Sequence, residues 1–369
     1  MSEMQARVQE TIERLVASGA EQGIQVAVYL HGELVVDAVA GIADATTGRI
    51  VTSDTPFYAT STGKGVAATV VHVLAERGVL DYDTRIAALW PEFGAHGKGR
   101  ATVRHALTHA VGVPGLPAAT TPEDLCDWQK LCATIAAATP WWEPGTKIGY
   151  HPLTWGYIIG EIVRRASGKS IAQVLRDEVA APLGIADELF FGVPAAALDR
   201  VARQEDAPGN AAKLAALPDD APIFAVVPRA VQPTAAFGNR ADILSADIPA
   251  TGTMTARAVA RMSAALLGAV GGVRLVSPER LRAITAVAMQ GVDAVMDVPT
   301  TFGLGYGLGF LGPLDRPTVF GMPGSGGTAA YADTARGLSI ALMKNVVTHG
   351  DYASFTEVAE AALGALPER

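Results

Sequence analysis

The chain has 369 residues, of which 49% are hydrophobic and 18% charged, and its 29 basic and 37 acidic side chains give a formal net charge of −8. These values predict a sizeable core in one large domain or two interleaved ones, and they exclude long disordered segments. No cluster of lysine and arginine stands out, so we expect neither nucleic acid nor a membrane as a partner.

The first predicted elements are a helix over 4–18 and two strands, Ile24–Leu30 and Glu33–Ala40, joined by a turn typical of two-residue hairpins. A longer helix follows from Ser61 to Arg77, where small and apolar residues run without a proline. Gly78 is suited to end it, because glycine readily adopts the left-handed conformation after a helix. This composition predicts a helix that is buried on all sides.

The spacing of apolar residues predicts a mostly helical middle of the chain, with helices over 102–110, 124–138, 153–167, 170–181, 255–269 and 278–288. The segment 192–250 is rich in Ala, Pro and Asp and has weak periodicity, which indicates a lid over a site or a flexible insertion. After a glycine- and aromatic-rich stretch, Gly303–Phe310, we expect strands over 318–320, 329–332 and 338–344, and a final helix over 351–364.

Strands near both ends of the chain, with helices between them, predict the α+β class of α/β fold, in which an antiparallel sheet is flanked by helices. We expect residues 1–60 and 290–369 to form a sheet domain from both termini. Residues 61–289 would form a mostly helical domain, with the lid-like insertion at about 192–250.

Cys126 and Cys132 lie close together in a predicted helix, without the paired spacing or neighbouring histidines of a zinc site. We therefore expect buried thiols, no metal and no cofactor. The N-terminus lacks a basic segment followed by an apolar one, and the apolar runs are too short to span a bilayer, so we expect a cytoplasmic protein.

Ser61 and Lys64 are the first candidates for chemistry. Spacing of three residues at a helix start places both side chains on one face, one turn apart. A serine hydroxyl becomes a strong nucleophile when a base takes its proton, and burial can lower the pKa of a lysine enough for that role. Of seven lysines, only Lys64 has a serine three residues before it. The alternative interpretation is a lysine that extends from the helix end into solvent.

Two further stretches carry possible site residues. Tyr150 follows a Pro-Gly turn and precedes a helix, where its phenol could relay protons with a lysine. The glycine-rich stretch from Phe320 to Gly327 precedes a strand, where an exposed backbone N–H could stabilise an oxyanion. Alone, each of these is more often an ordinary loop.

Together the three features resemble the serine β-lactamase and penicillin-binding protein superfamily, and most closely its family VIII carboxylesterases. The resemblance covers roughly residues 10–365. It rests on Phe57 to Lys64, Thr102 to His109, Pro144 to His151, Gly160 to Val163, and Pro249 to Gly252.

The resemblance implies an acyl-enzyme on Ser61, proton transfer by Lys64 and Tyr150, and an oxyanion hole formed by the N–H groups of Ser61 and Ser325. His105 and His109 match a segment that is usually structural in this family. The residues expected around the substrate are His151, Trp155, Met322, Gly324 and Thr251.

Two departures from the family bear on the substrate. Relatives that bind β-lactams usually have Asn two residues after the tyrosine, where this chain has Pro152, and Lys or His where it has Met322. Proline offers no amide and methionine cannot hold a carboxylate, so we expect a neutral, fairly apolar acyl ester. The alternatives are an acyltransferase with the same site, a β-lactamase or D-amino-peptidase, and a catalytically inactive binding protein.

Overall fold

The computed structural model describes residues 2–309 and 312–366 of the chain. Its main sheet has nine strands in the order β3-β2-β1-β13-β12-β11-β10-β9-β8. Their bounds are β1 Gly23–Leu30, β2 Glu33–Asp44, β3 Arg49–Ile50, β8 Met289–Val292, β9 Pro299–Phe302, β10 Gly307–Leu308, β11 Val319–Pro323, β12 Ala329–Asp333 and β13 Leu338–Lys344. The two ends of the chain meet where β1 pairs antiparallel with β13 and Ile24 lies opposite Lys344.

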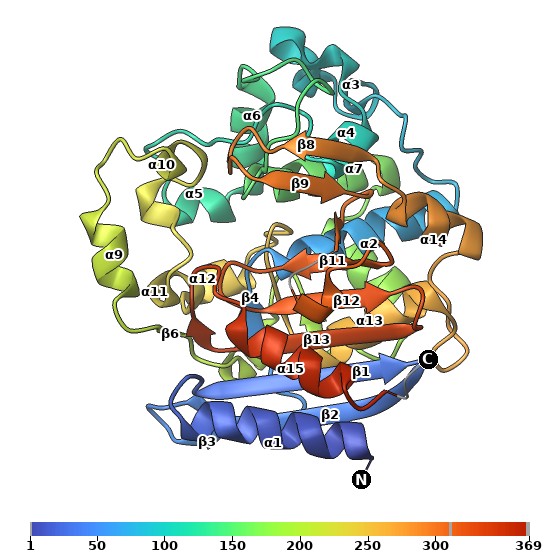
Figure 1. Cartoon of the computed structure of the whole chain (residues 1–369). Coiled ribbons are helices and arrows are strands. Elements are labelled where there is room, and N and C mark those ends of the chain that lie inside the picture. Colours follow the sequence, from blue (N-terminus) through green and yellow to red (C-terminus); the bar gives the residue numbers. More distant parts are fainter. Residues whose placement is uncertain (1, 310–311, 367–369) are drawn as a thin grey trace.

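Helices cover this sheet because each has one apolar stripe. α1 (Glu3–Ala17) buries its stripe of Met4, Val8, Ile12 and Leu15, and it packs beside α15 (Ala353–Leu363). Both helices share an apolar cluster with residues of β1, β2 and β13 (Figure 1). α13 (Ala256–Leu267) packs on β1, β12 and β13, where it belongs to a different and larger apolar cluster.

The rest of the chain is mostly short helices. Their bounds are α3 Ile86–Leu89, α4 Val103–Leu107, α5 Pro122–Cys126, α6 Trp128–Ala137, α7 Thr154–Ser167, α8 Ile171–Val174, α9 Asn210–Ala216, α10 Ile223–Val226, α11 Ala235–Gly238, α12 Ala241–Ser245 and α14 Pro278–Thr285. A small antiparallel sheet has the order β4-β7-β5, with β4 Phe57–Ala59, β5 Leu189–Phe190 and β7 Gly252–Met254. A short parallel pair joins β6 (Glu205–Asp206) to β14 (Val346–Val347).

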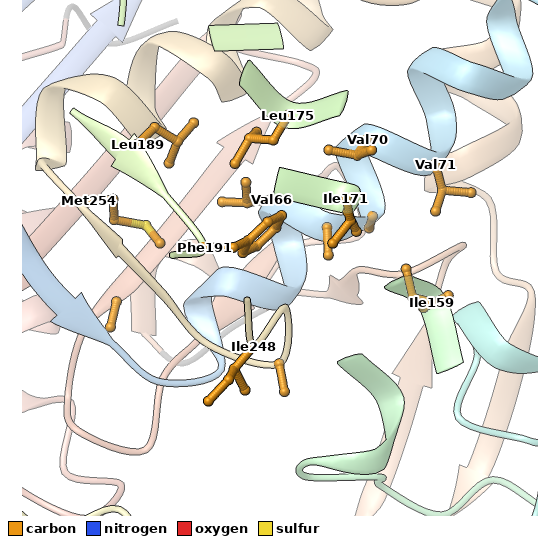
Figure 2. Close-up of a cluster of buried hydrophobic side chains, with 14 of the residues drawn as sticks. Val66, Val70, Val71, Ile159, Ile171, Leu175, Leu189, Phe191, Ile248 and Met254 are labelled. Atoms are coloured by element: carbon orange, nitrogen blue, oxygen red, sulfur yellow. The ribbon is translucent and has the colours of Figure 1, made fainter. Parts of the chain in front are cut away.

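The helix α2 (Thr62–Glu76) runs through the larger apolar cluster, and all but its last residue are buried. Figure 2 shows its side chains Val66, Val70 and Val71 among apolar residues of other segments, which include Ile159, Ile171, Leu175, Leu189, Phe191, Ile248 and Met254. Close packing on every side fixes the position of the first turn of α2.

Most predicted elements are present, with small shifts at their ends. The predicted helix over 124–138 is two helices, because Asp127 leaves the helical conformation and its side chain caps α6 at Lys130 N. The strands β8 and β9 were not predicted, and Phe310 lies outside the described residues. The segment 192–250 holds short helices and β6. The division into two domains stays a prediction. No helix of residues 2–309 and 312–366 is long and apolar enough to cross a membrane.

Candidate active site

Ser61 lies at the start of α2, directly after β4, which the small sheet holds against β7. Its backbone is helical (φ −62°, ψ −9°), and its side chain makes no capping bond to the helix. The hydroxyl is therefore left to other partners. Lys64 Nζ lies 3.1 Å from Ser61 Oγ, as the three-residue spacing predicts.

Lys64 is completely buried, and its ammonium group donates to Pro152 O at 2.7 Å and to Ala250 O at 3.2 Å besides Ser61. These partners are neutral, and burial lowers the pKa of Lys64 to about 7. At neutral pH a large share of the side chain is therefore the free amine, which can accept the hydroxyl proton of Ser61 across the same contact.

Tyr150 lies beside this pair. Lys64 Nζ is 5.0 Å from the centre of the Tyr150 ring. Burial raises the pKa of Tyr150 well above its ordinary value, and a hydrogen bond with the Ser61 side chain opposes that rise only in part. At neutral pH Tyr150 is thus a neutral phenol, whereas a large share of Lys64 is the free amine.

The loop before α7 holds Tyr150 in place, because backbone hydrogen bonds tie this loop to the segment 109–112. The bonds run from Trp141 N to Gly112 O, from Gly145 N to Ala110 O and from Gly149 N to His109 O. Gly145 has a φ of +87° and lies against the ring of His105, so any side chain there would be both strained and obstructed. His109 itself packs against Tyr150, with ring centres 4.7 Å apart.

Ser325 lies in the loop between β11 and β12 and lines the same cavity as Ser61. Thr60 Oγ1 accepts from Gly326 N at 3.2 Å and from Ser325 Oγ at 3.3 Å, and Gly350 N donates to Ser325 O at 2.7 Å. Within the described part of the chain, the N–H groups of Ser61 and Ser325 donate to no protein acceptor. That is the arrangement an oxyanion hole requires, and this role of the two groups stays a prediction.

A cavity of about 420 Å³ opens over Ser61 and has a largely apolar lining. Its described lining contains no Asp, Glu, Lys or Arg side chain. The lining residues are Tyr58, Thr60, Ser61, Tyr150, Pro152, Leu153, Ile223, Val227, Val231, Gln232, Pro233, Phe237, Ala250, Thr251, Met296, Ser325, His349, Gly350 and Tyr352. Many of them come from the predicted lid-like segment 192–250.

Of the five residues expected around the substrate, only Thr251 lines this cavity. His151 is buried: Val113 N donates to its Nε2 at 3.0 Å, Gly149 O is the partner of its Nδ1, and burial lowers its pKa to about 3. Trp155 is 1% exposed. The rings of both residues lie 5.8 Å from the ring of His109, which packs against Tyr150, so they support the site and do not line it.

Met322 and Gly324 also lie behind the cavity wall. Met322 is buried with Ile148 and Phe302, where its apolar side chain fits and a cation would not. At Gly324, a Cβ would lie 2.6 Å from Thr328 Oγ1 and 2.7 Å from Thr60 Oγ1. Gly324 thus lets the loop approach α2 closely and offers no side chain to a substrate.

Sequence reasoning missed much of the wall, including Tyr58, Phe237, Met296, His349 and Tyr352. These residues are far apart in the sequence and lie on four different segments. They come together only in the folded chain, so no pattern in a single sequence could predict that they share a cavity.

The family follows from comparison with known proteins. The profile of the Beta-lactamase family matches residues 8–363, so the chain belongs to that family. It is 37% identical over 339 residues to the esterase/beta-lactamase LipL of Mycobacterium tuberculosis, which covers 88% of this chain and 77% of the relative.

Solved structures agree with this. A crystal structure of a family VIII carboxylesterase matches with a TM-score of 0.88 and 35% identity over 98% of both chains. A penicillin-binding protein homologue from Caulobacter crescentus matches with a TM-score of 0.84 and 34% identity, also over 98% of both chains. The resemblance and the fold class expected from the sequence are thereby confirmed.

Gly63 allows α2 to pack closely against residues 250–252, where Ala250 O accepts a hydrogen bond from Lys64 Nζ. A Cβ there would overlap the backbone C=O of Thr251 and lie 2.8 Å from Gly252 N. We expect Gly63→Ala to lower the free energy of unfolding by about 3 kcal/mol or more, since backbone cannot move aside as a side chain can. Urea unfolding followed by circular dichroism measures this. Gly268→Ala is the control, because a Cβ there meets nothing within 4 Å.

Proposed function

We propose that the protein is a serine hydrolase of the carboxylesterase type, which cleaves small to medium acyl esters through an acyl-serine intermediate. The observation that carries the proposal is the contact of 3.1 Å between Ser61 Oγ and the buried Lys64 Nζ, at the floor of an apolar cavity. The names of the relatives, an esterase/beta-lactamase and a carboxylesterase, support the same class of reaction.

In the proposed reaction, Ser61 Oγ attacks the ester carbonyl carbon while the Lys64 amine takes its proton. The N–H groups of Ser61 and Ser325 would hold the negative oxygen that forms. When the carbon–oxygen bond to the alcohol breaks, the proton returns to the leaving oxygen through Tyr150. A water molecule then attacks the acyl carbon while the Lys64 amine takes its proton. The bond from that carbon to Ser61 Oγ breaks, the acid leaves, and the proton passes to Ser61 Oγ.

The cavity favours a neutral acyl group. A substrate carboxylate would meet no Lys or Arg side chain in the described lining, and Met322 is buried where relatives that bind β-lactams usually place Lys or His. Burial of an unpaired charge costs several kcal/mol, so we propose that β-lactams and D-amino-peptides are poor substrates.

An acyltransferase is the second candidate. Ile223, Val227 and Val231 from the lid-like segment line an apolar cavity, which would limit access of water to an acyl-enzyme. Incubation with p-nitrophenyl butyrate, with and without an added alcohol or amine, tests both. Release of butyric acid alone supports the esterase, whereas conversion mainly to a new ester or amide supports the transferase. No release of p-nitrophenol under any condition would contradict both.

The value of kcat/KM for ester hydrolysis should rise with pH through about 7 and then level off. Below this pH, Lys64 is an ammonium ion and cannot accept the Ser61 proton, whereas above it the free amine can. Hydrolysis of p-nitrophenyl butyrate from about pH 5 to about pH 9, measured by total product, checks this. A profile that falls from pH 6 upward would rule out Lys64 as the base.

The proposed partner is a small-molecule ester. The absence of nucleic acid and membrane partners, the cytoplasmic location and the lack of a cofactor stay predictions.

A further inference from the structure

A buried carboxylate in the β8–β9 hairpin contacts the backbone of Tyr150. Asp293 is 2% exposed and lies just after β8. Tyr150 N donates to both of its oxygens, at 3.0 Å to Oδ1 and 2.8 Å to Oδ2. No signal in the local sequence marks Asp293, because the two residues are far apart along the chain.

The same carboxylate also holds the hairpin turn. Val295 N and Met296 N donate to Oδ1 at 2.8 and 2.9 Å. The turn itself is closed by Asp293 N donating to Val298 O at 2.9 Å. Met296 lines the cavity over Ser61. One carboxylate therefore joins a wall of the cavity to the backbone of the tyrosine.

The carboxylate of Asp293 has only backbone amides as hydrogen-bond partners among the described residues. Among the described residues, no Lys, Arg or His forms an ion pair with it. Isolated buried carboxylates are costly unless hydrogen bonds satisfy them, and here three N–H groups do so. The turn needs only Oδ1 of Asp293, because Val295 N and Met296 N both donate to that oxygen. Oδ2 serves only Tyr150 among the hydrogen bonds of the described chain.

We propose that Asp293 is a positioning residue for Tyr150, which fixes the height of the phenol over Lys64 and Ser61. This inference rests on the proposed esterase function. The neighbouring residues of the loop are held elsewhere: Gly149 N donates to His109 O, and His151 N donates to His109 Nδ1 at 3.0 Å. Asp293 is thus the specific anchor of Tyr150 itself.

The variant Asp293→Asn separates the two tasks of the side chain. Its amide oxygen can keep the Oδ1 bonds to Val295 N and Met296 N, while its NH₂ group would face Tyr150 N–H, donor against donor. We expect kcat for p-nitrophenyl butyrate to fall by about 10- to 100-fold with KM nearly unchanged, because the cavity wall stays in place and only the proton relay is displaced.

A double-mutant cycle shows whether the effect passes through the phenol. In the Tyr150→Phe background, Asp293→Asn should have almost no further effect on kcat. Asp297→Asn is the matched control: it removes an exposed carboxylate from the same turn at a φ of 54°, which asparagine tolerates, and should leave kcat unchanged. Asp293→Glu keeps the carboxylate but moves it by one methylene. It is the variant to test if Asp293→Asn does not fold.

Full activity of a folded Asp293→Asn or Asp293→Glu variant would overturn the inference. So would an equal loss of kcat in the wild-type and Tyr150→Phe backgrounds, since that result would mean a general structural role. Failure of the proposed function gives a different result: the wild-type protein would then release no p-nitrophenol and accept no fluorophosphonate on Ser61.

Discussion

Ser61→Ala should reduce the hydrolysis of p-nitrophenyl butyrate by about 10⁴-fold or more, to the level left by binding alone. Among the described residues, Ser61 Oγ is the hydroxyl that Lys64 Nζ contacts. The neighbouring hydroxyl of Thr60 accepts from Gly326 N and Ser325 Oγ, and among the described residues it makes no hydrogen bond with Lys64. Loss of this single oxygen thus removes the bond-forming atom.

Mass spectrometry of the intact protein after brief mixing with the substrate provides the direct measurement. The wild type should gain one butyryl group on the peptide that contains Ser61, and the variant should gain none. Ser245→Ala is the control, because Ser245 is an exposed serine at the end of α12, outside the cavity. If Ser61→Ala keeps full activity, this assignment of the nucleophile is wrong.

Lys64→Met should lower kcat/KM by about 10²- to 10⁴-fold, the usual contribution of a general base. Methionine has a similar length and apolar stem, so it preserves the packing of α2 while removing the amine. The remaining serine would have to lose its proton to water. Activity within a few-fold of the wild type at neutral pH would exclude Lys64 from proton transfer.

The same variant should alter the dependence of stability on pH. The folded-state pKa of Lys64 is about 7, below its ordinary value of 10.5, so between these values the unfolded chain binds more protons than the folded one. The free energy of unfolding of the wild type should therefore rise with pH across this range relative to that of Lys64→Met. Thermal unfolding of both proteins from about pH 7 to about pH 10 checks this, and parallel curves would contradict the lowered pKa.

The pair Ser61 and Lys64 could be predicted from sequence because helix geometry alone brings residues i and i+3 together. The contact of Tyr150 with this pair needed the family resemblance, since it depends on how a loop packs on another segment. His151 was expected around the substrate from the family resemblance. The structure turns it inward, where Val113 N and Gly149 O occupy its two nitrogens.

In the fold, too, elements with a strong local sequence pattern were predicted, and elements without one were not. Long elements with a clear pattern or composition, such as α1, α2 and β13, were predicted within a residue or two of their ends. β8 and β9 are short, and three of the four residues of β8 are exposed, so hydrophobic alternation did not reveal them. The hairpin they form nonetheless brings Met296 and Asp293 to the site.

The antiparallel pairing of β1 with β13 sets the order of events during synthesis. The ribosome releases residues 23–30 early, yet their partner strand at 338–344 emerges only after the intervening helices. Until then, β1 has β2 as its strand neighbour, and the backbone groups of its other edge are open to other chains. The loop that carries Ser325 lies between β11 and β12, so the two halves of the site come together only when the last strands of the sheet have joined.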